Sequence, residues 1–237
     1  MKKIILAAAA SAAILTSTAF AMDDQFYLKV EGGASIFQKV KKTGTVLGVS
    51  DSVKLKSNTS GIFGAGVGFY VMDNFRSELT FDMLVNPRLK KNINVPATTV
   101  TPATTFAPGT VVNVKHKANI GSLLLSGYVD FYEAGGFKLY AGAGIGAAQV
   151  REKITNAYTP YTSSTVQTVS FKTKKTYNFA YQVGAGASAV VADGVQVELG
   201  YSWRDYGKTK SKTINGDTVG KTHYRGHNVI AGLRFDI

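Results

Sequence analysis

The sequence contains no cysteine, little proline and no long apolar run beyond its N-terminus. The absence of thiols excludes disulfides, thiolate metal sites and a cysteine nucleophile. After residue 21, no stretch approaches the roughly 20 apolar residues that a membrane-spanning helix needs. All five prolines lie between the alternating segments described below, where a residue without a ladder donor is tolerated; they are Pro87, Pro96, Pro102, Pro108 and Pro160.

The first 21 residues have the pattern of a secretory signal peptide. Lys2 and Lys3 precede an apolar run over 4–15, and Ala19–Ala21 supplies small residues at a cleavage site. We predict cleavage between Ala21 and Met22, which leaves residues 22–237 as one domain. An exported chain without a membrane helix is soluble or a closed β-barrel, because only a barrel otherwise satisfies every backbone polar group in lipid.

Alternation of apolar and polar residues is the main structural signal. In Val195–Trp203 every second residue is apolar, and glycine or polar residues lie between them. This period of two gives a strand one apolar face and one polar face. The pattern occurs in eight segments, which are 26–37, 62–71, 75–84, 120–131, 137–150, 177–191, 195–204 and 225–237.

Connections of unequal length join these segments. Three are tight turns at 71–75, 131–137 and 191–195, and four run to about twenty residues or more. This asymmetry is typical of outer-membrane barrels. We therefore predict an all-β fold: an eight-stranded antiparallel up-and-down transmembrane β-barrel with four long extracellular loops and both termini periplasmic. Aromatic residues are expected to form girdles near the strand ends, namely Phe26, Phe69, Phe75, Phe131, Phe137 and Phe235 at one end and Phe37, Phe63, Phe179 and Trp203 at the other. A soluble sandwich is the alternative.

The inward positions carry charges of both signs. They are Lys29, Arg76, Lys138, Arg204 and Arg234 against Glu31, Glu78, Asp82, Asp130, Glu198 and Asp236. Because buried charges must be compensated, this near balance predicts a lumen closed by ion pairs and hydrogen bonds. Such a lumen disfavours a small porin, and carboxylates distributed along it are expected to be structural rather than catalytic.

Three segments resemble the opacity-protein-like family of small outer-membrane barrels. They are Gly61–Phe81, Leu139–Gly146 and Gln182–Gly207, and within that family the lysine-rich loops are most similar to the surface adhesins of rickettsiae. The resemblance implies the fold; the family includes adhesins, immune-exposed antigens and barrels of unknown role. The ending Gly232–Ile237 is similar to the signal read by the barrel-assembly machinery, although Ile237 replaces the usual Phe and Ile230 stands where a polar residue is common.

Charge is sorted between loops and barrel. The long loops (37–60, 85–119, 151–175 and 205–224) hold 19 of the 25 Lys and Arg residues after position 21 but only four acids, so they carry +15, while the remainder carries −5. Such a field attracts polyanions. We predict a ligand-binding rim made of Lys39, Lys41, Lys42, Lys54, Lys56, Arg88, Lys90, Lys91, Lys115, Lys117, Lys172, Lys174, Lys175, Lys208, Lys210 and Lys212.

These features predict a surface adhesin with a role in virulence, which binds host-cell surface proteins or sulfated glycans. The alternative is a structural barrel whose lysines bind lipopolysaccharide phosphates of its own outer membrane. Export argues against nucleic acid, despite the basic charge. An enzyme is not expected: His223 or His227 with Ser211 or Asp217 matches no catalytic motif, and His116 lies alone in a loop. No cofactor or metal site is predicted, since the Gly-x-Gly repeats lack the following helix of a phosphate loop.

Overall fold

The computed structural model describes residues 26–38, 40–46, 49–57, 59–85, 88–94, 111–158, 167–172, 174–209, 212–214, 217–219 and 222–237. Eight strands form the barrel wall: β1 (Phe26–Phe37), β4 (Ser60–Met72), β5 (Phe75–Val85), β7 (Val111–Ala134), β8 (Phe137–Tyr158), β10 (Thr176–Ala192), β11 (Val195–Lys208) and β14 (His223–Asp236). No helix among the described residues is long and apolar enough to cross a membrane.

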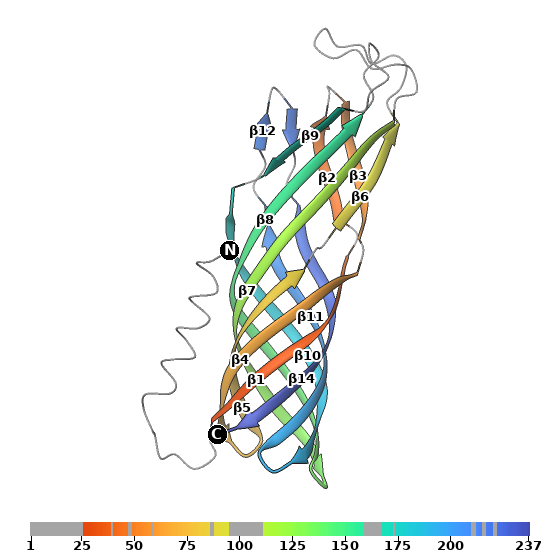
Figure 1. Ribbon diagram of the computed structural model, residues 1–237. Helices are drawn as coiled ribbons and strands as arrows, with labels where there is room; N and C mark the ends of the chain where they lie inside the picture. Colours follow the sequence, from red (N-terminus) through yellow and green to blue (C-terminus); the bar gives the residue numbers. More distant parts are fainter. Residues whose placement is uncertain are drawn as a thin grey trace.

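The eight strands close into an antiparallel barrel in chain order (Figure 1). Each strand pairs with the next, and β1 pairs with β14 from Tyr27 opposite Asp236 to Phe37 opposite Gly226. Closure leaves the wall without a free edge, because every strand of the barrel has a partner on both sides. The predicted eight-stranded antiparallel barrel and all eight predicted segments are confirmed.

The hairpins at one end of the barrel are built alike, and we call this end the tight-turn end. Two-residue turns join β4 to β5, β7 to β8 and β10 to β11. Gly135, Gly136 and Gly194 have positive φ in these turns, a conformation that glycine adopts without steric cost. Each hairpin has a register shift in its first strand just before the turn, as at Tyr70/Met72. The chain also returns here, since the Ile237 amide donates to the Phe26 carbonyl at 2.8 Å.

At the opposite end, which we call the loop end, the wall continues beyond the eight predicted segments. β7 and β8 pair as far as Asn113 opposite Ala157, well past the predicted limits at Ile120 and Val150. Six further strands extend this end: β2 (Val40–Val46), β3 (Val49–Ser57), β6 (Arg88–Asn94), β9 (Gln167–Lys172), β12 (Lys212–Ile214) and β13 (Asp217–Val219). Parts of the predicted loops are therefore strands, which their mostly polar, like-charged sequences did not indicate.

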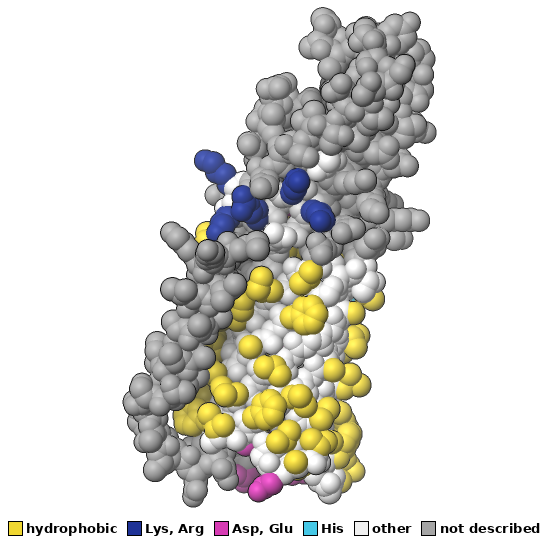
Figure 2. Space-filling view, in the orientation of Figure 1, with side chains coloured by type: hydrophobic (Ala, Val, Ile, Leu, Met, Phe, Trp, Pro, Cys, Tyr) yellow, Lys and Arg dark blue, Asp and Glu magenta, His cyan; other side chains and the backbone are white. Residues whose placement is uncertain are grey.

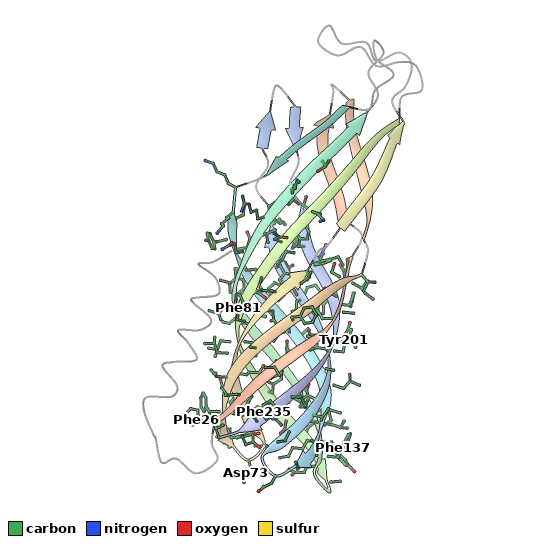
Figure 3. All side chains as sticks on the ribbon, viewed as in Figure 1. Phe26, Asp73, Phe81, Phe137, Tyr201 and Phe235 are labelled. Atoms are coloured by element: carbon green, nitrogen blue, oxygen red, sulfur yellow. The ribbon has the colours of Figure 1, made fainter. Side chains whose placement is uncertain are left out.

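The outer wall is apolar, as Figure 2 shows for one face of the molecule. Large hydrophobic side chains are exposed along each of the eight barrel strands, and Figure 3 shows Phe26, Phe81, Phe137 and Phe235 on the wall. This inverted distribution is that of a barrel in lipid. Of the aromatic residues expected in the two girdles, seven are exposed on the wall and Phe75 and Trp203 are half-buried, whereas Phe37 is only 4% exposed. Phe37 has the same parity on β1 as the inward Lys29 and therefore points into the lumen.

Candidate functional site

Charged side chains form a network across the lumen, centred on Lys29 of β1. Its Nζ lies 3.0 Å from Glu31, 3.2 Å from Glu78 and 3.0 Å from Glu198. These carboxylates come from β1, β5 and β11, so a single cation joins strands from opposite sides of the barrel. Because each charged group is buried beside partners of opposite sign, the network offsets part of its desolvation.

Three arginines complete this layer. Arg76 binds Asp130, and Arg234 lies 3.1 Å from Glu198. Arg204 lies 2.5 Å from Asp82. Two of the guanidinium groups also stack on tyrosine rings, with Arg76 4.5 Å from the centre of the Tyr140 ring and Arg234 5.0 Å from that of Tyr27. The prediction of an ion-paired lumen therefore agrees with the geometry.

Small inward residues make room for the tyrosines. A Cβ added to Gly68 would lie 2.2 Å from the Tyr27 ring, and one added to Gly142 would lie 2.3 Å from the Tyr128 ring. No side chain fits at either distance, so glycine is required opposite each ring. The Gly-x-Gly repeats of the sequence thus serve packing inside the barrel.

An apolar layer lies in the lumen on the loop-end side of the charged network. Phe37 packs against Tyr206 and Tyr224, with ring centres 6.2 and 5.8 Å apart. The Tyr224 hydroxyl donates to Glu152. Further members of the cluster are Ile62, Leu84, Ile120, Leu124, Val150 and Ile230. Sequence reasoning missed this layer, although strands with apolar residues on both faces near their loop ends, such as 123–125, carried the signal.

Together the two layers close the barrel. A cavity of about 40 Å³ lies beside Lys29, Tyr140 and Arg204, which is room for only a few water molecules. Charged side chains, tyrosines and aliphatic side chains are buried in the described part of the lumen. The lumen is thus a packed core, and the surfaces available for binding are the wall and the rims.

Exposed charge at the loop end is cationic among the described side chains. Lys117, Arg151, Lys153, Lys174, Lys175 and Lys208 are all exposed there. The two acids described in the same region, Glu152 and Asp205, are buried. Asp205 is held by His223 at 2.7 Å and by the amide of Gly207. Burying these two acids removes them from the surface, so the exposed charge of the described side chains is positive there.

The tight-turn end has the opposite charge. Asp73 and Asp193 are exposed in turns, and Glu133 is 58% exposed beside Lys138. Figure 2 shows both ends, with Lys and Arg gathered beyond the apolar band at one end and acids at the other. The apolar band separates the two charged rims. The barrel is therefore electrically polar along its axis.

Most predicted ligand-binding positions lie on strands of the loop end. Lys117, Lys174, Lys175 and Lys208 have exposed side chains. The strand positions whose side chains the structure does not describe are Lys41, Lys42, Lys54, Lys56, Arg88, Lys90, Lys91, Lys115, Lys172 and Lys212. Lys39, Lys210 and the cleavage site at Ala21 and Met22 lie outside the described residues. Sequence reasoning did not single out Arg151 and Lys153, which adjoin this set.

The two histidines whose side chains the structure describes each form hydrogen bonds. His223 binds Asp205, while His227 contacts the hydroxyl of Tyr201 at 2.6 Å and Gln38 at 3.3 Å. Ser211 lies outside the described residues, and the side chains of Asp217 and His116 are not described. Among the described residues, no three His, Asp or Glu side chains gather as metal ligands would.

A family model described as the outer membrane protein beta-barrel domain matches residues 6–235. The chain belongs to this family. It is an outer-membrane β-barrel, as its closed wall and apolar exterior indicate. The resemblance seen in the strand sequences therefore holds for nearly the whole chain.

Relatives from rickettsiae match the chain over its full length. Proteins named as adhesins by similarity in Rickettsia conorii and Rickettsia rickettsii are each 43% identical, and each alignment covers 100% of both chains. Among solved structures, Neisserial surface protein A is similar with a TM-score of 0.48 and 15% identity, over 90% of this chain and 97% of that one. OprG of Pseudomonas aeruginosa has a TM-score of 0.48 and 12% identity, over 90% and 96%.

Proposed function

We propose that this protein is a surface adhesin that holds polyanionic host surfaces, sulfated glycans or acidic proteins, at its loop end. The loop end faces outward in this proposal, and both termini lie in the periplasm. The observation that carries it is the one-sided surface charge, with exposed cations at the loop end and both described acids buried there. The adhesin names of full-length relatives support the same function.

The mechanism is electrostatic capture followed by many weak contacts. A rim of one sign steers a polyanion toward the surface and raises its local concentration. Several cations then bind at once, and the combined affinity exceeds that of any single contact. A closed lumen fits this role, because binding at the rim needs no passage through the barrel.

The remaining parts of the proposal concern export. The signal peptide is removed between Ala21 and Met22, and the barrel-assembly machinery recognises the last strand, which ends Gly232–Ile237. Sequencing the N-terminus of protein isolated from outer membranes tests the first step directly. A terminus other than Met22 would contradict it.

The test of adhesion is a fourfold charge substitution, which we call the crown variant. It combines Lys41→Gln, Lys42→Gln, Lys54→Gln and Lys208→Gln, and Lys41 is directly opposite Lys54 between β2 and β3. We expect binding of labelled host cells to refolded barrel to fall roughly tenfold, because several contacts are lost together. Raising salt to 1 M, where the screening length is about 3 Å, should weaken wild-type binding in the same way.

The matched control is Lys138→Gln, which removes one cation from the opposite rim. It should leave host-cell binding unchanged. Undiminished binding by the crown variant at both low and high salt would contradict adhesion through these lysines.

A further inference from the structure

Four exposed cations lie on the side of the wall, and we call them the outer-wall cluster: Lys117 of β7, Arg151 and Lys153 of β8, and Lys175 just before β10. Lys117 is directly opposite Lys153, and Asn119 is opposite Arg151. Thr176 is opposite Val150, which places Lys175 beside this group. Three neighbouring strands thus present one small basic surface.

The cluster lies on the outer face of the wall, at a level where the inward-facing side chains are buried. The alternating residues between its members, Ala118, Val150, Glu152 and Thr176, are buried. Successive side chains of a strand point to opposite faces, so the four cations project from the outer face. They therefore belong to the flank of the barrel, whereas a ligand approaching from outside the cell meets the rim first.

The cluster directly follows the apolar band along its strands. Tyr177 and Phe179 of β10 are 69% and 65% exposed, and the Tyr177 hydroxyl accepts a hydrogen bond from Gln149 at 3.0 Å. Exposed tyrosine with a polar partner marks the level at which hydrocarbon gives way to headgroups. Figure 2 shows Lys and Arg side chains beyond the yellow band on the face that is drawn. Cations at this level lie among lipid headgroups.

Among the residues that the structure describes, no acid forms a salt bridge with the cluster. The salt bridges of the described residues lie in the lumen, at Glu133–Lys138 and at Asp205–His223, so none includes these four cations. Like charges directly opposite one another in a sheet, such as Lys117 and Lys153, destabilise the pairing. The neighbouring register positions continue the same sign, with Arg88 opposite Lys117 and Lys172 opposite Lys153. An anion from outside the chain would remove this repulsion.

We propose that the outer-wall cluster binds the phosphate groups of a phosphorylated glycolipid in the outer leaflet, the lipid A part of lipopolysaccharide. The site combines cations at headgroup level with aromatic and aliphatic wall for the acyl chains. The predicted ligand-binding cations thus divide into two sets: Lys117 and Lys175 belong to the outer-wall cluster, and the positions of the crown variant do not. This inference shares with adhesion only the outward orientation of the loop end.

The experiment compares the full-length barrel, refolded in phosphatidylcholine vesicles, with and without diphosphorylated lipid A. The variant combines Lys117→Gln, Arg151→Gln, Lys153→Gln and Lys175→Gln. The measurement is the temperature at which the folded gel band converts to the unfolded one. For wild type, lipid A should raise this temperature by about 5 °C, since a ligand of the folded state stabilises it. The cluster variant should lose this rise, and the crown variant should keep it.

A second comparison separates lipid binding from a structural role. In phosphatidylcholine alone the cluster variant should be as stable as wild type or more so, because the substitutions remove repulsion. Dephosphorylated lipid A should raise the wild-type transition far less than the diphosphorylated form. If the variant is less stable in phosphatidylcholine alone, the cations serve packing and the proposal is wrong.

The remaining outcomes distinguish this proposal from adhesion. Retention of the lipid A effect by the cluster variant would overturn it. The proposal would also be overturned if the cluster variant lost heparin binding but kept the lipid A effect. That result would show that the cluster binds a host glycan. If only the crown variant loses host-cell binding, the lipid A site is unaffected. If the wild-type protein binds no host cells but is stabilised by lipid A, only the adhesion proposal is refuted.

Discussion

Glu198 and Leu199 are neighbours in β11 that face opposite environments. Glu198 is buried between Lys29, Arg76 and Arg234, whereas Leu199 is 61% exposed on the wall. The sequence alone left open whether Glu198 had a charged partner. Its three partners make it a position where a single change leaves several buried charges uncompensated.

We therefore expect Glu198→Gln to lower the free energy of unfolding by about 3–5 kcal/mol, as breaking a buried ion pair does. Urea unfolding followed by the fluorescence of Trp203, the only tryptophan, measures this loss. The control is Glu133→Gln, whose exposed pair with Lys138 should contribute less than about 1 kcal/mol. Equal effects of the two substitutions would show that the lumen network contributes little.

The adjacent residue tests the outer face. Leu199→Arg should lower stability by about 2–4 kcal/mol, because a cation on the lipid face near the midplane is poorly solvated. Leu199→Met keeps the apolar surface and should be nearly neutral. The same urea titration in lipid vesicles measures both variants. An Arg variant as stable as wild type would contradict the assignment of this face to lipid.

At the scale of the elements, the hairpin of β7 and β8 allows a test of whether the wall extends beyond the membrane as paired strands. β8 is paired on both sides at Thr155, with Lys115 of β7 and Ser170 of β9. Thr155→Pro removes a ladder donor there and should loosen this extension while leaving the barrel closed. Trypsin should then cut near Lys153 faster, with an unchanged heat-dependent gel shift. Thr155→Val is the control, and equal cleavage rates would contradict the extension.

Element by element, the sequence predicted the barrel well and its loop end poorly. Alternation located the strands because lipid and lumen impose opposite demands on successive side chains, as at Glu198 and Leu199. Where the wall leaves the membrane that contrast is lost, and β6 (Arg88–Asn94) looks like a polar loop. Phe37 is aromatic like the girdle residues, but its parity with Lys29 on β1 places it in the lumen. Apolar residues such as Leu124 can face a filled lumen as well as lipid.

At the scale of the whole molecule, the two lumen layers predict a barrel that does not conduct ions. Ions would have to pass both the Lys29 network and the cluster around Phe37 and Tyr224. Purified protein in planar lipid bilayers should show no steady single-channel conductance above the bilayer baseline. A reproducible conductance would revive the small-porin alternative. Heat-unfolded protein prepared in parallel is the control for contaminating porins.

The pairing of β1 with β14 has a kinetic consequence. This seam joins Tyr27 to Asp236, residues separated by almost the whole length of the chain. Among the eight barrel strands, every other pairing joins strands that follow one another along the chain, so the seam cannot form until the final strand is available. Until then two unpaired edges stay open to other chains, and closure of such a distant contact is slow. The chain is therefore most exposed to mispairing between its insertion into the membrane and the formation of this seam. A protein that covers both open edges during this period would prevent such mispairing.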